Sequence, residues 1–292
     1  MIPHVSWRCR ERTLVLGSRP LVMGILNVTP DSFSDGGRHQ DPDAAIRHGL
    51  EMAEAGADII DVGGESTRPG AQAVAPEAEA GRVIPVIRAL AQAFVGKPGA
   101  PALSVDTRKA VVARAALAAG ADIINDVTAL EGDPSMPGVT REYGAGVILM
   151  HMRGDPSMMQ QDPRYGDVVA EVAAYLAGRV AVLKAAGLKP DTMALDPGIG
   201  FGKTLGHNVK LIAGLQALVA LGYPVVVGLS RKSMVSAITG RDVTHRLAGS
   251  IAGAVWAAGQ GAHVWRVHDV AESVDAARMV EMMRKEAIDW NG

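Results

Sequence analysis

The amino-acid sequence predicts a single (β/α)8 barrel of the α/β class, and two observations lead to this prediction. Along the 292 residues, apolar runs of strand length recur eight times, with helical patterns between them. The runs are apolar at successive positions, as in strands buried on both faces of a parallel sheet. The predicted strands span residues 21–27, 57–63, 102–106, 122–126, 147–151, 193–196, 225–230 and 263–269.

A partial internal repeat is the second observation. The segments AGADIIDVGG (55–64), AGADIINDV (119–127), YGAGVILMH (143–151) and QGAHVWRVHD (260–269) each place a glycine before an apolar strand and polar residues after it. Glycine ends a helix readily because it adopts the left-handed conformation at little cost. The spacing between the copies is uneven, which favours a barrel over a solenoid.

The chain is predicted to hold one barrel domain over residues 14–292, because no linker, charge block or low-complexity tract interrupts it. Residues 1–13 are predicted to be a peripheral strand or a poorly ordered tail. Two loops at strand ends, 29–41 and 65–76, look long. Long loops at the strand ends of a barrel usually cover the substrate.

The composition excludes several classes of protein. A net charge of −2 argues against bulk electrostatic binding to nucleic acid or to a membrane surface. The single cysteine, Cys9, permits no internal disulfide, which fits a reducing compartment. No apolar run has the length of a signal peptide or of a membrane helix. We therefore expect a soluble cytoplasmic protein.

Polar residues follow the predicted strands at the ends where a barrel of this kind carries its chemistry. Such a set is typical of a polar pocket and not of a core. The residues are Asn27, Asp61, Asp106, Asn125, His151, Asp196, Ser230, Lys232, Arg266 and His268.

The motif DPGIGFGKT (196–204) looks like a phosphate-binding loop but is not one. Pro197 occupies the position where the P-loop requires its first glycine, and the glycines at 198, 200 and 202 do not fit the dinucleotide-binding pattern. Two interpretations stay open. The motif is a flexible turn, or its small residues let a planar ligand approach Asp196, whose carboxylate could accept two hydrogen bonds from a guanine- or pterin-like edge.

Two further motifs bring cations to strand ends. In GLSRKS (228–233), Ser230 is predicted to cap a helix whose first turn holds Arg231 and Lys232. Cations there oppose the helix dipole, which favours a role in binding an anion or a polar ring. In WRVHDV (265–270), Arg266 and His268 face the same way because side chains alternate along a strand. We expect this pair to be functional.

The segments GILNVTPDSFSDGG (24–37) and GGESTRPG (63–70) place oxygen ligands, carboxylates and an arginine on one rim of the barrel. Such a set suits a magnesium-bound phosphate, because magnesium takes a few protein oxygens together with substrate oxygens and water. The residues are Asn27, Asp31, Asp35, Thr67 and Arg68. His151 is expected to be structural, and without a Cys/His cluster zinc is not expected.

Together these motifs resemble the dihydropteroate synthases, the folate-pathway enzymes that join p-aminobenzoate to a pterin. The segments that carry the resemblance run in order from Met23 to Val270, which is nearly the whole chain. They are MGILNVTPDSFSDGG, DVGGESTRPG, SVDT, NDV, LMHMRG, DPGIGFGK, GLSRKS and RLAGSIAGAVWAAGQGAHVWRVHDV. One departure is Ile199, where many relatives carry an aromatic residue.

The resemblance implies a (β/α)8 barrel that is usually a homodimer and acts on small molecules. The implied reaction displaces diphosphate from 6-hydroxymethyl-7,8-dihydropterin diphosphate by the arylamine of p-aminobenzoate, giving 7,8-dihydropteroate. Magnesium is the implied cofactor, bound at Asn27. Sulfonamide analogues of p-aminobenzoate are expected to bind.

The resemblance also assigns roles to individual residues of this chain. The pterin is expected to contact Asp106, Asn125, Asp196, Lys232 and Arg266, with Arg266 stacking on its ring. The diphosphate is expected to contact Thr67, Arg68, Arg266 and His268. The p-aminobenzoate site is expected to contain Phe33, Thr67, Pro69, Phe201 and Ser230. The predicted catalytic residues are Arg68, Lys232, Arg266 and His268.

Two other functions are compatible with a pterin pocket. A methyltetrahydrofolate:corrinoid methyltransferase would share the aspartate and asparagine anchors, but it needs no diphosphate rim. A non-catalytic paralogue could bind pterin without turnover. The polar residues of both long loops argue against each alternative.

Overall fold

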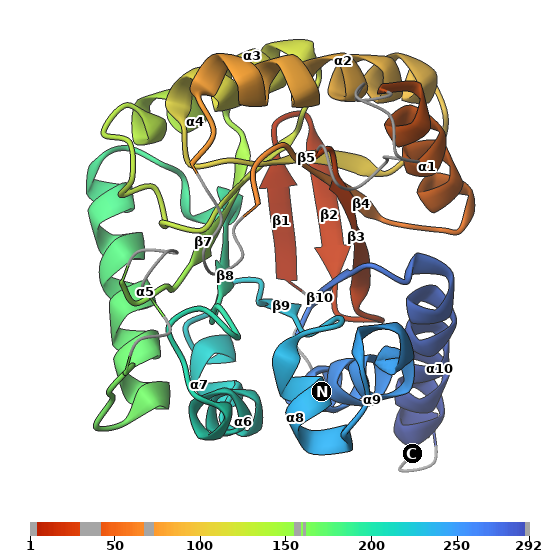
Figure 1. Ribbon diagram of the computed structural model, residues 1–292, viewed down its shortest axis with the longest axis vertical. Coiled ribbons are helices and arrows are strands. Elements are labelled where there is room, and N and C mark those ends of the chain that lie inside the picture. Colours follow the sequence, from red (N-terminus) through yellow and green to blue (C-terminus); the bar gives the residue numbers. More distant parts are fainter. Residues whose placement is uncertain (1–4, 30–41, 67–72, 155–158, 160–161, 290–292) are drawn as a thin grey trace.

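The computed structural model describes residues 5–29, 42–66, 73–154, 159 and 162–289. Within these residues, eight parallel strands pair in the order β8-β7-β6-β5-β4-β3-β10-β9. A bridge between Leu195 and Val225 joins the two outer strands, so the sheet closes into a barrel (Figure 1). The predicted TIM barrel is therefore confirmed. The strands are β3 (Leu21–Asn27), β4 (Ile59–Gly63), β5 (Ala102–Asp106), β6 (Ile123–Asp126), β7 (Gly146–Met150), β8 (Met193–Asp196), β9 (Val226–Gly228) and β10 (Val264–Val267).

Helices follow each of these strands and surround the barrel (Figure 1). Two short 3₁₀ turns, Pro190–Thr192 and Val243–His245, precede β8 and α9. The described helices are too short or too polar to cross a membrane. They are α1 (Pro42–Glu54), α2 (Pro76–Phe94), α3 (Ala110–Ala119), α4 (Met136–Tyr143), α5 (Val168–Ala185), α6 (Leu205–Ala213), α7 (Gln216–Val219), α8 (Ser233–Thr239), α9 (Leu247–Gly259) and α10 (Val270–Asp289).

The glycines of the sequence repeat lie where the prediction puts them, at the carboxyl ends of helices. Gly120 follows α3 with a φ of 116°, and Gly144 follows α4 with a φ of 60°. Their amide groups donate to carbonyls of the last helical turn. An L-residue with a side chain would be strained at these angles, so glycine fixes the point at which each helix turns into the next strand.

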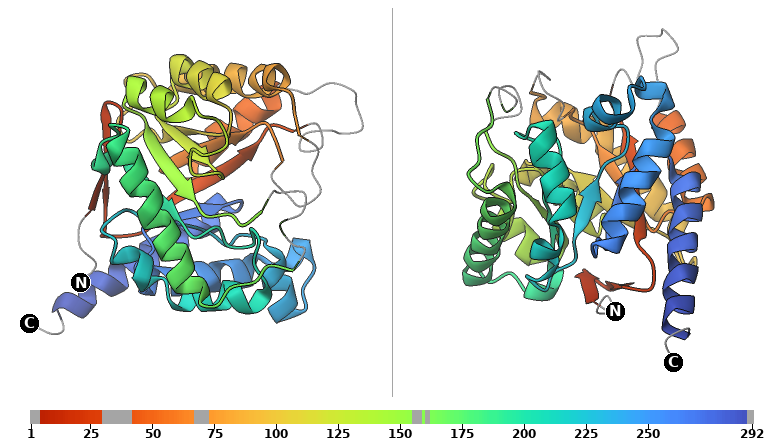
Figure 2. Two further views of the ribbon diagram at one scale, coloured as in Figure 1. Left: turned by 90° about the vertical axis from the view of Figure 1, so that its left-hand side faces the viewer. Right: turned by 90° about the horizontal axis from the view of Figure 1, so that it is seen from below.

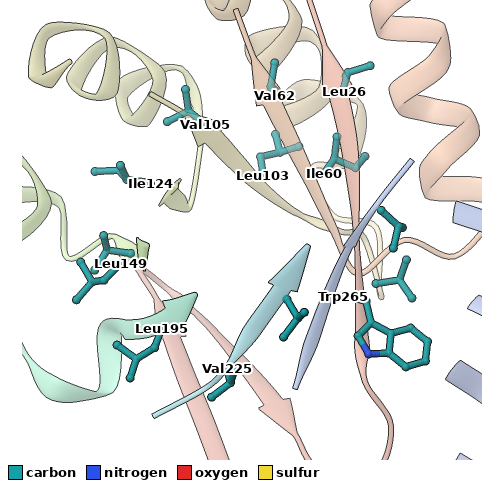
Figure 3. Packing of buried hydrophobic residues seen from close by; sticks show 14 of the residues in the cluster. Leu26, Ile60, Val62, Leu103, Val105, Ile124, Leu149, Leu195, Val225 and Trp265 are labelled. Atoms are coloured by element: carbon teal, nitrogen blue, oxygen red, sulfur yellow. The ribbon is translucent and has the colours of Figure 1, made fainter. Parts of the chain in front are cut away.

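Residues that point outward from the barrel form the larger apolar core, between the sheet and the helices. Figure 3 shows side chains of this core, which come from alternate positions of the strands. The strands are buried on both faces, because this outer core occupies one face and the barrel interior occupies the other. The predicted strands are therefore apolar along most of their length. The labelled residues are Leu26, Ile60, Val62, Leu103, Val105, Ile124, Leu149, Leu195, Val225 and Trp265.

The inward positions of most strands change character along the strand. At the beginning of the strands they are apolar and buried, for example Met23, Ile59 and Ile123. At the end of the strands they are polar, for example Asp106 and Asn125. One barrel therefore has an apolar end and a polar end, which we call by these names below.

An antiparallel hairpin precedes the barrel and covers its apolar end (Figure 2). It consists of β1 (Val5–Cys9) and β2 (Arg12–Leu16), so it continues past residue 13. Trp7, Cys9 and Leu16 are fully buried in one cluster with the inward residues of the strands. The Trp7 Nε1–H also donates to the carbonyl of Thr192 at 2.9 Å, because a buried indole needs a partner.

Candidate active site

The polar end of the barrel is assembled by strand register. Asn27 of β3 pairs with Gly63 of β4, Gly63 with Asp106 of β5, and Asp106 with Asn125 of β6. In parallel strands such a row lies at one level, and all four positions have the inward parity. Asp196 of β8 and Arg266 of β10 have the same parity on their strands. The predicted pterin residues of the strands are thus brought to one end of the barrel.

Arg266 is held between two carboxylates. Its Nε donates to Asp61 Oδ2 at 2.7 Å, and its Nη2 donates to Asp106 Oδ2 at 2.7 Å. Asn125 Nδ2 donates to the same Asp61 oxygen at 3.0 Å. These bonds lie along the edge of the guanidinium plane, so they orient the group and leave its two faces for stacking.

Asp61 is a site residue to which the sequence assigned no role. It is fully buried, and its second carboxylate oxygen has no partner among the described residues. A buried carboxylate is costly unless it is paired, so its function here is to fix Arg266 and Asn125. The signal that could have found it is its inward parity, two positions before the glycine that pairs with Asn27.

Burial changes the protonation of this group of residues. It raises the pKa of Asp106 to about 7, against the opposing charge of Arg266. Burial by itself would lower the pKa of Arg266, but Asp61 and Asp106 outweigh it and raise that pKa. Arg266 therefore stays charged, while the proton occupancy of Asp106 changes near neutral pH.

Asp126, the residue after Asn125, shows how strictly the alternation sorts these side chains. Asn125 points into the barrel, whereas Asp126 points outward and organises the loop that follows β6. The Asp126 carboxylate accepts hydrogen bonds from the amide and hydroxyl of Thr128, each at 2.7 Å, and from the amide of Leu130. Asp126 is therefore a loop-forming residue, although it stands next to a predicted pterin ligand.

Asp196 lies at the end of β8, directly before the turn that contains the three glycines of the motif, which we call the glycine turn. The Gly198 amide donates to Asp196 Oδ1 at 2.7 Å. Burial raises the pKa of Asp196, while the charges of Lys232 and Arg266 and the bond from Gly198 act in the opposite direction. A ligand that donates hydrogen bonds would compensate the buried carboxylate.

The three glycines of this turn are needed for close packing and not for flexibility. Gly198, Gly200 and Gly202 have φ angles of 65°, 84° and 64°. A Cβ built on Gly198 would collide with the carbonyl oxygen of His151, and one on Gly202 with that of Arg153. The turn therefore presses its backbone against the chain that leaves β7.

Lys232 faces this turn from the other side. Its amine donates to the Ile199 carbonyl and lies 4.5 Å from the centre of the Phe201 ring. Burial lowers the pKa of Lys232 to about 8, and the charge of Asp196 opposes that effect. Lys232, Phe201 and Asp196, which the resemblance assigned to two adjacent substrates, therefore share one wall of the polar end.

The prediction that Ser230 caps a helix is wrong. The helix α8 begins only at Ser233, and Lys232 precedes it without a side-chain cap. Arg231 has a φ of 57°, which a right-handed helix cannot contain, so Arg231 and Lys232 do not form a first turn. Ser230 Oγ instead lies 3.0 Å from His268 Nδ1 and accepts a bond from the His268 amide at 3.1 Å.

The predicted site residues fall into three groups. The first shares the polar end of the barrel, and the second borders it in the loops after β8, β9 and β10. The third lies outside the described residues. The first group is Asn27, Asp106, Asn125, Asp196 and Arg266; the second is Phe201, Ser230, Lys232 and His268; the third is Phe33, Thr67, Arg68 and Pro69, together with Asp31 and Asp35.

Two other observations complete the site. His151 is almost fully buried on the helix-facing side, where its ring packs edge-on against Tyr175 with centroids 5.0 Å apart. This agrees with the expected structural role. Across the described part of the chain, acidic, histidine and cysteine side chains nowhere form a group of three or more that could hold a metal ion.

Comparison with known proteins gives the class of this chain. The family model described as pterin binding enzyme matches residues 23–268. This match covers most of the sequence, from within β3 to His268, so it includes the strands of the barrel except the first two residues of β3. The chain therefore belongs to the family of pterin-binding enzymes.

Within that family its relatives are dihydropteroate synthases. The enzyme of Escherichia coli (strain K12) is 50% identical over 264 residues, which are 90% of this chain and 92% of that protein. The structure of Xanthomonas albilineans dihydropteroate synthase with 4-aminobenzoic acid has a TM-score of 0.88 and 48% identity, covering 97% of this chain and 99% of that one. The Yersinia pestis enzyme in a sulfonamide drug complex has a TM-score of 0.89 and 46% identity, covering 97% and 100%. The resemblance inferred from the motifs is confirmed.

Proposed function

We propose that this chain condenses 6-hydroxymethyl-7,8-dihydropterin diphosphate with p-aminobenzoate, releasing 7,8-dihydropteroate and diphosphate. It is a dihydropteroate synthase, a transferase of folate biosynthesis. The observation that carries the proposal is the polar end of the barrel, where Asp106, Asn125 and Asp196 converge around the guanidinium of Arg266. The names of the relatives and the 4-aminobenzoic acid in the Xanthomonas structure support the same reaction.

The pterin half of the substrate suits this set of side chains. The ring carries amino and ring N–H groups on one edge, which can donate to buried carboxylates. Asp196 has a carboxylate that is short of donors, since the bond described for it comes from the Gly198 amide. The faces of Arg266, which its two edge-on ion pairs leave open, can stack on the ring.

The chemical step breaks the bond between the pterin methylene carbon and the diphosphate oxygen. Negative charge grows on the leaving diphosphate, and we assign its stabilisation to Arg68, Arg266 and His268, with Thr67 as a hydrogen-bond donor. The methylene carbon becomes cationic and shares its charge with the electron-rich ring. The arylamine nitrogen then forms the new bond to this carbon and releases its proton to water. Because the carbon is already cationic, the step needs little general-base catalysis.

Magnesium is part of the proposal, with Asn27 as its protein ligand. Gly63 lies between Asn27 and Asp106 in the register and has no side chain; a Cβ built there would lie 3.9 Å from Asn27 Oδ1. The space and the amide oxygen fit an ion that takes its other ligands from phosphate and water. When bound, magnesium would neutralise charge on the diphosphate.

We assign the p-aminobenzoate site to Phe201 and Ser230, together with Phe33, Thr67 and Pro69. The Phe201 ring offers an apolar face to the aromatic substrate, and the amine of Lys232 lies above that ring. Sulfonamides share the aniline group of p-aminobenzoate, so we expect them to compete for this site.

The chain is also proposed to be a cytoplasmic homodimer. The helices α9 and α10 pack side by side, and the Arg284 guanidinium donates to the Ala258 carbonyl at 2.9 Å (Figure 1). Trp256 and, on one face of α10, Met279, Met282 and Met283 are each more than half exposed. Large apolar side chains gathered on neighbouring helices are typical of an interface. Sedimentation of the Trp256→Arg variant, expected to be monomeric, tests this.

The test of the proposed function is diphosphate release from the pterin diphosphate with magnesium, measured with and without p-aminobenzoate. Release that tracks dihydropteroate formation supports the synthase. Pterin binding without product would favour the non-catalytic paralogue. In calorimetry, Asp196→Asn should weaken pterin binding, whereas Glu142→Gln on the exposed side of α4 should not. Equal affinities of the two variants would contradict the pterin assignment.

A further inference from the structure

Lys203 is a buried cation that the proposed reaction does not use. Its side chain lies directly after the glycine turn and is almost inaccessible to solvent, with 3% of the residue exposed. Among the described residues, its amine donates to the carbonyls of Phe201 at 2.9 Å, Gly198 at 3.0 Å and His151 at 3.2 Å. It also lies 2.9 Å from His151 Nδ1. Polar groups this well surrounded hold parts of a structure in place.

These acceptors come from two different segments of backbone. Gly198 and Phe201 belong to the turn after β8, and His151 belongs to the chain that leaves β7. The two segments are in contact, because a Cβ on Gly198 would collide with the His151 carbonyl oxygen. Without the amine, three carbonyl dipoles would converge in a buried place. The Gly198 carbonyl would keep the Phe201 amide as a donor, whereas the carbonyls of Phe201 and His151 would lose the side-chain donor that Lys203 gives them.

A second lysine holds the same turn from the barrel interior. Lys232 donates to the carbonyl of Ile199, and its amine lies over the Phe201 ring. The carbonyls of residues 198 and 201 thus accept from Lys203, and the carbonyl of residue 199 between them accepts from Lys232. The turn contains few bonds of its own, among them the Phe201 amide to the Gly198 carbonyl at 3.0 Å and the Gly200 amide to Asn208 Oδ1 at 2.8 Å.

We propose that Lys203 is a positioning residue for the p-aminobenzoate site: its amine ties the glycine turn to the end of β7 and thereby fixes the Phe201 ring. This rests on the proposed function, which places p-aminobenzoate against Phe201. Lys203 touches neither substrate. It acts through the backbone of residues 198–202.

The anchor works in either protonation state of the amine. Burial lowers the pKa of Lys203 to about 7, and the charge of Asp196 opposes that effect. Burial also lowers the pKa of His151 to about 3, so that ring is neutral. A protonated Lys203 can donate to three acceptors. A neutral amine donates to two carbonyls and accepts from the Nδ1–H tautomer of His151.

The first experiment compares Lys203→Met with Lys210→Met, a matched loss of an exposed lysine on α6. Lys203→Met keeps an unbranched side chain that is one atom shorter and removes the donors. The KM for p-aminobenzoate should rise by about tenfold, while the affinity for the pterin changes much less. Lys210→Met should match the wild type. An unchanged KM in Lys203→Met, or an equal loss for both substrates, would overturn the proposal.

Chemical rescue separates the amine from the space it fills. In a Cys9→Ala background, the thiol of a Lys203→Cys variant is alkylated before refolding, either with 2-bromoethylamine or with 1-bromopropane. The first reagent restores an amine at the position of the lysine nitrogen, and the second adds a chain of the same length without it. Recovery of the KM only with the amine supports the proposal. Equal recovery with both reagents contradicts it.

A readout without catalysis keeps this inference independent of the proposed function. Hydrogen exchange at the Phe201 amide should become at least about tenfold faster in Lys203→Met and should be restored by aminoethylation. If the wild type forms no dihydropteroate, the proposed function fails, and the exchange rates still decide whether Lys203 anchors the turn. Unchanged exchange would show that it does not.

Discussion

The apolar end and the polar end of the barrel are made by the same strands at the same inward parity. At the apolar end, Met23, Ile59 and Ile123 pack against the hairpin, and its Trp7 is fully buried. At the polar end, Arg266 joins Asp61 and Asp106 through charged hydrogen bonds. Most strands thus carry both environments within a few residues.

The difference separates stability from function. Burying apolar side chains stabilises the fold, whereas buried charges are at best compensated by their partners. The polar end keeps charges whose pKa values burial has shifted, such as that of Asp106. A protein holds such groups where a ligand needs them. Changes at the two ends should therefore have different consequences.

The largest effect is expected from Arg266→Ala. Catalytic efficiency should fall about a thousandfold, because the change removes a donor to the diphosphate and a stacking surface for the pterin. Stability should also fall by about 3 kcal/mol, since Asp61 and Asp106 lose their shared cation. Steady-state kinetics and denaturant unfolding measure the two losses. Arg114→Ala, on the exposed side of α3, is the control. A loss of activity below tenfold in Arg266→Ala would contradict the assignment.

The change Trp7→Ala at the apolar end should have the opposite character. It leaves a cavity and an unpaired Thr192 carbonyl, so the free energy of unfolding should fall by about 3 to 5 kcal/mol. The kcat of the folded enzyme should stay within about twofold of the wild type. Unfolding curves and active-site titration measure these values, with Val15→Ala on the exposed side of β2 as the control. A fall in kcat as large as that in Arg266→Ala would refute the separation of the two ends.

The two ends should also differ in their response to pH. Because burial raises the pKa of Asp106 to about 7, the native state holds a proton between about pH 4 and 7 that the unfolded chain releases. This contribution to stability is present at low pH and is lost as the pH rises through 7. In the wild type, the free energy of unfolding should therefore fall by at least about 1 kcal/mol as the pH rises through that window. The Asp106→Asn variant should not show this fall.

Cys9→Ala is the matched variant at the apolar end. Burial raises the pKa of the Cys9 thiol, so the thiol is neutral throughout that window in both states. The change in the free energy of unfolding caused by Cys9→Ala should therefore be the same at about pH 4 and at about pH 7. If thermal unfolding showed equal pH profiles for the wild type and Asp106→Asn, the raised pKa would be disproved.

The smallest effect is expected from Arg8→Ala, at the margin of the apolar end. Arg8 forms two hydrogen bonds with Asp191, at 2.8 Å and 3.1 Å, but the Asp191 side chain is half exposed. Exposed ion pairs contribute about 0 to 1 kcal/mol. Stability should change by no more than that, and activity should not change. A loss comparable to that of Trp7→Ala would mean that the hairpin is held by charge and not by packing.

The sequence was sufficient for the barrel because its strands are buried on both faces, which leaves an unmistakable apolar pattern. It was also sufficient to predict that Asp106 and Asn125 lie together at the polar end, because strand alternation determines which residues point inward. These residues are specified by local patterns. The hairpin was less well specified, since β1 and β2 are short and only partly buried, and residues 1–13 fitted either a strand or a tail.

Other parts of the site depend on backbone geometry that residue types do not reveal. The left-handed conformation of Arg231 displaces the start of α8 and turns Ser230 toward His268. The partners of Lys203 are mostly main-chain carbonyls, which every residue has, so no motif announces them. The role of Asp61 depends on a partner 205 positions away in the chain.

The contact between Trp7 and Thr192 has a consequence for synthesis of the protein on the ribosome. The two residues are 185 positions apart in the chain. Translation proceeds at about 5 to 20 residues per second, so roughly 10 to 40 s pass between synthesis of Trp7 and synthesis of Thr192. During that time Trp7 and Leu16 have nothing of the finished barrel to pack against. The hairpin is thus made long before the surface that buries it, and during that time it is a natural point of contact for chaperones.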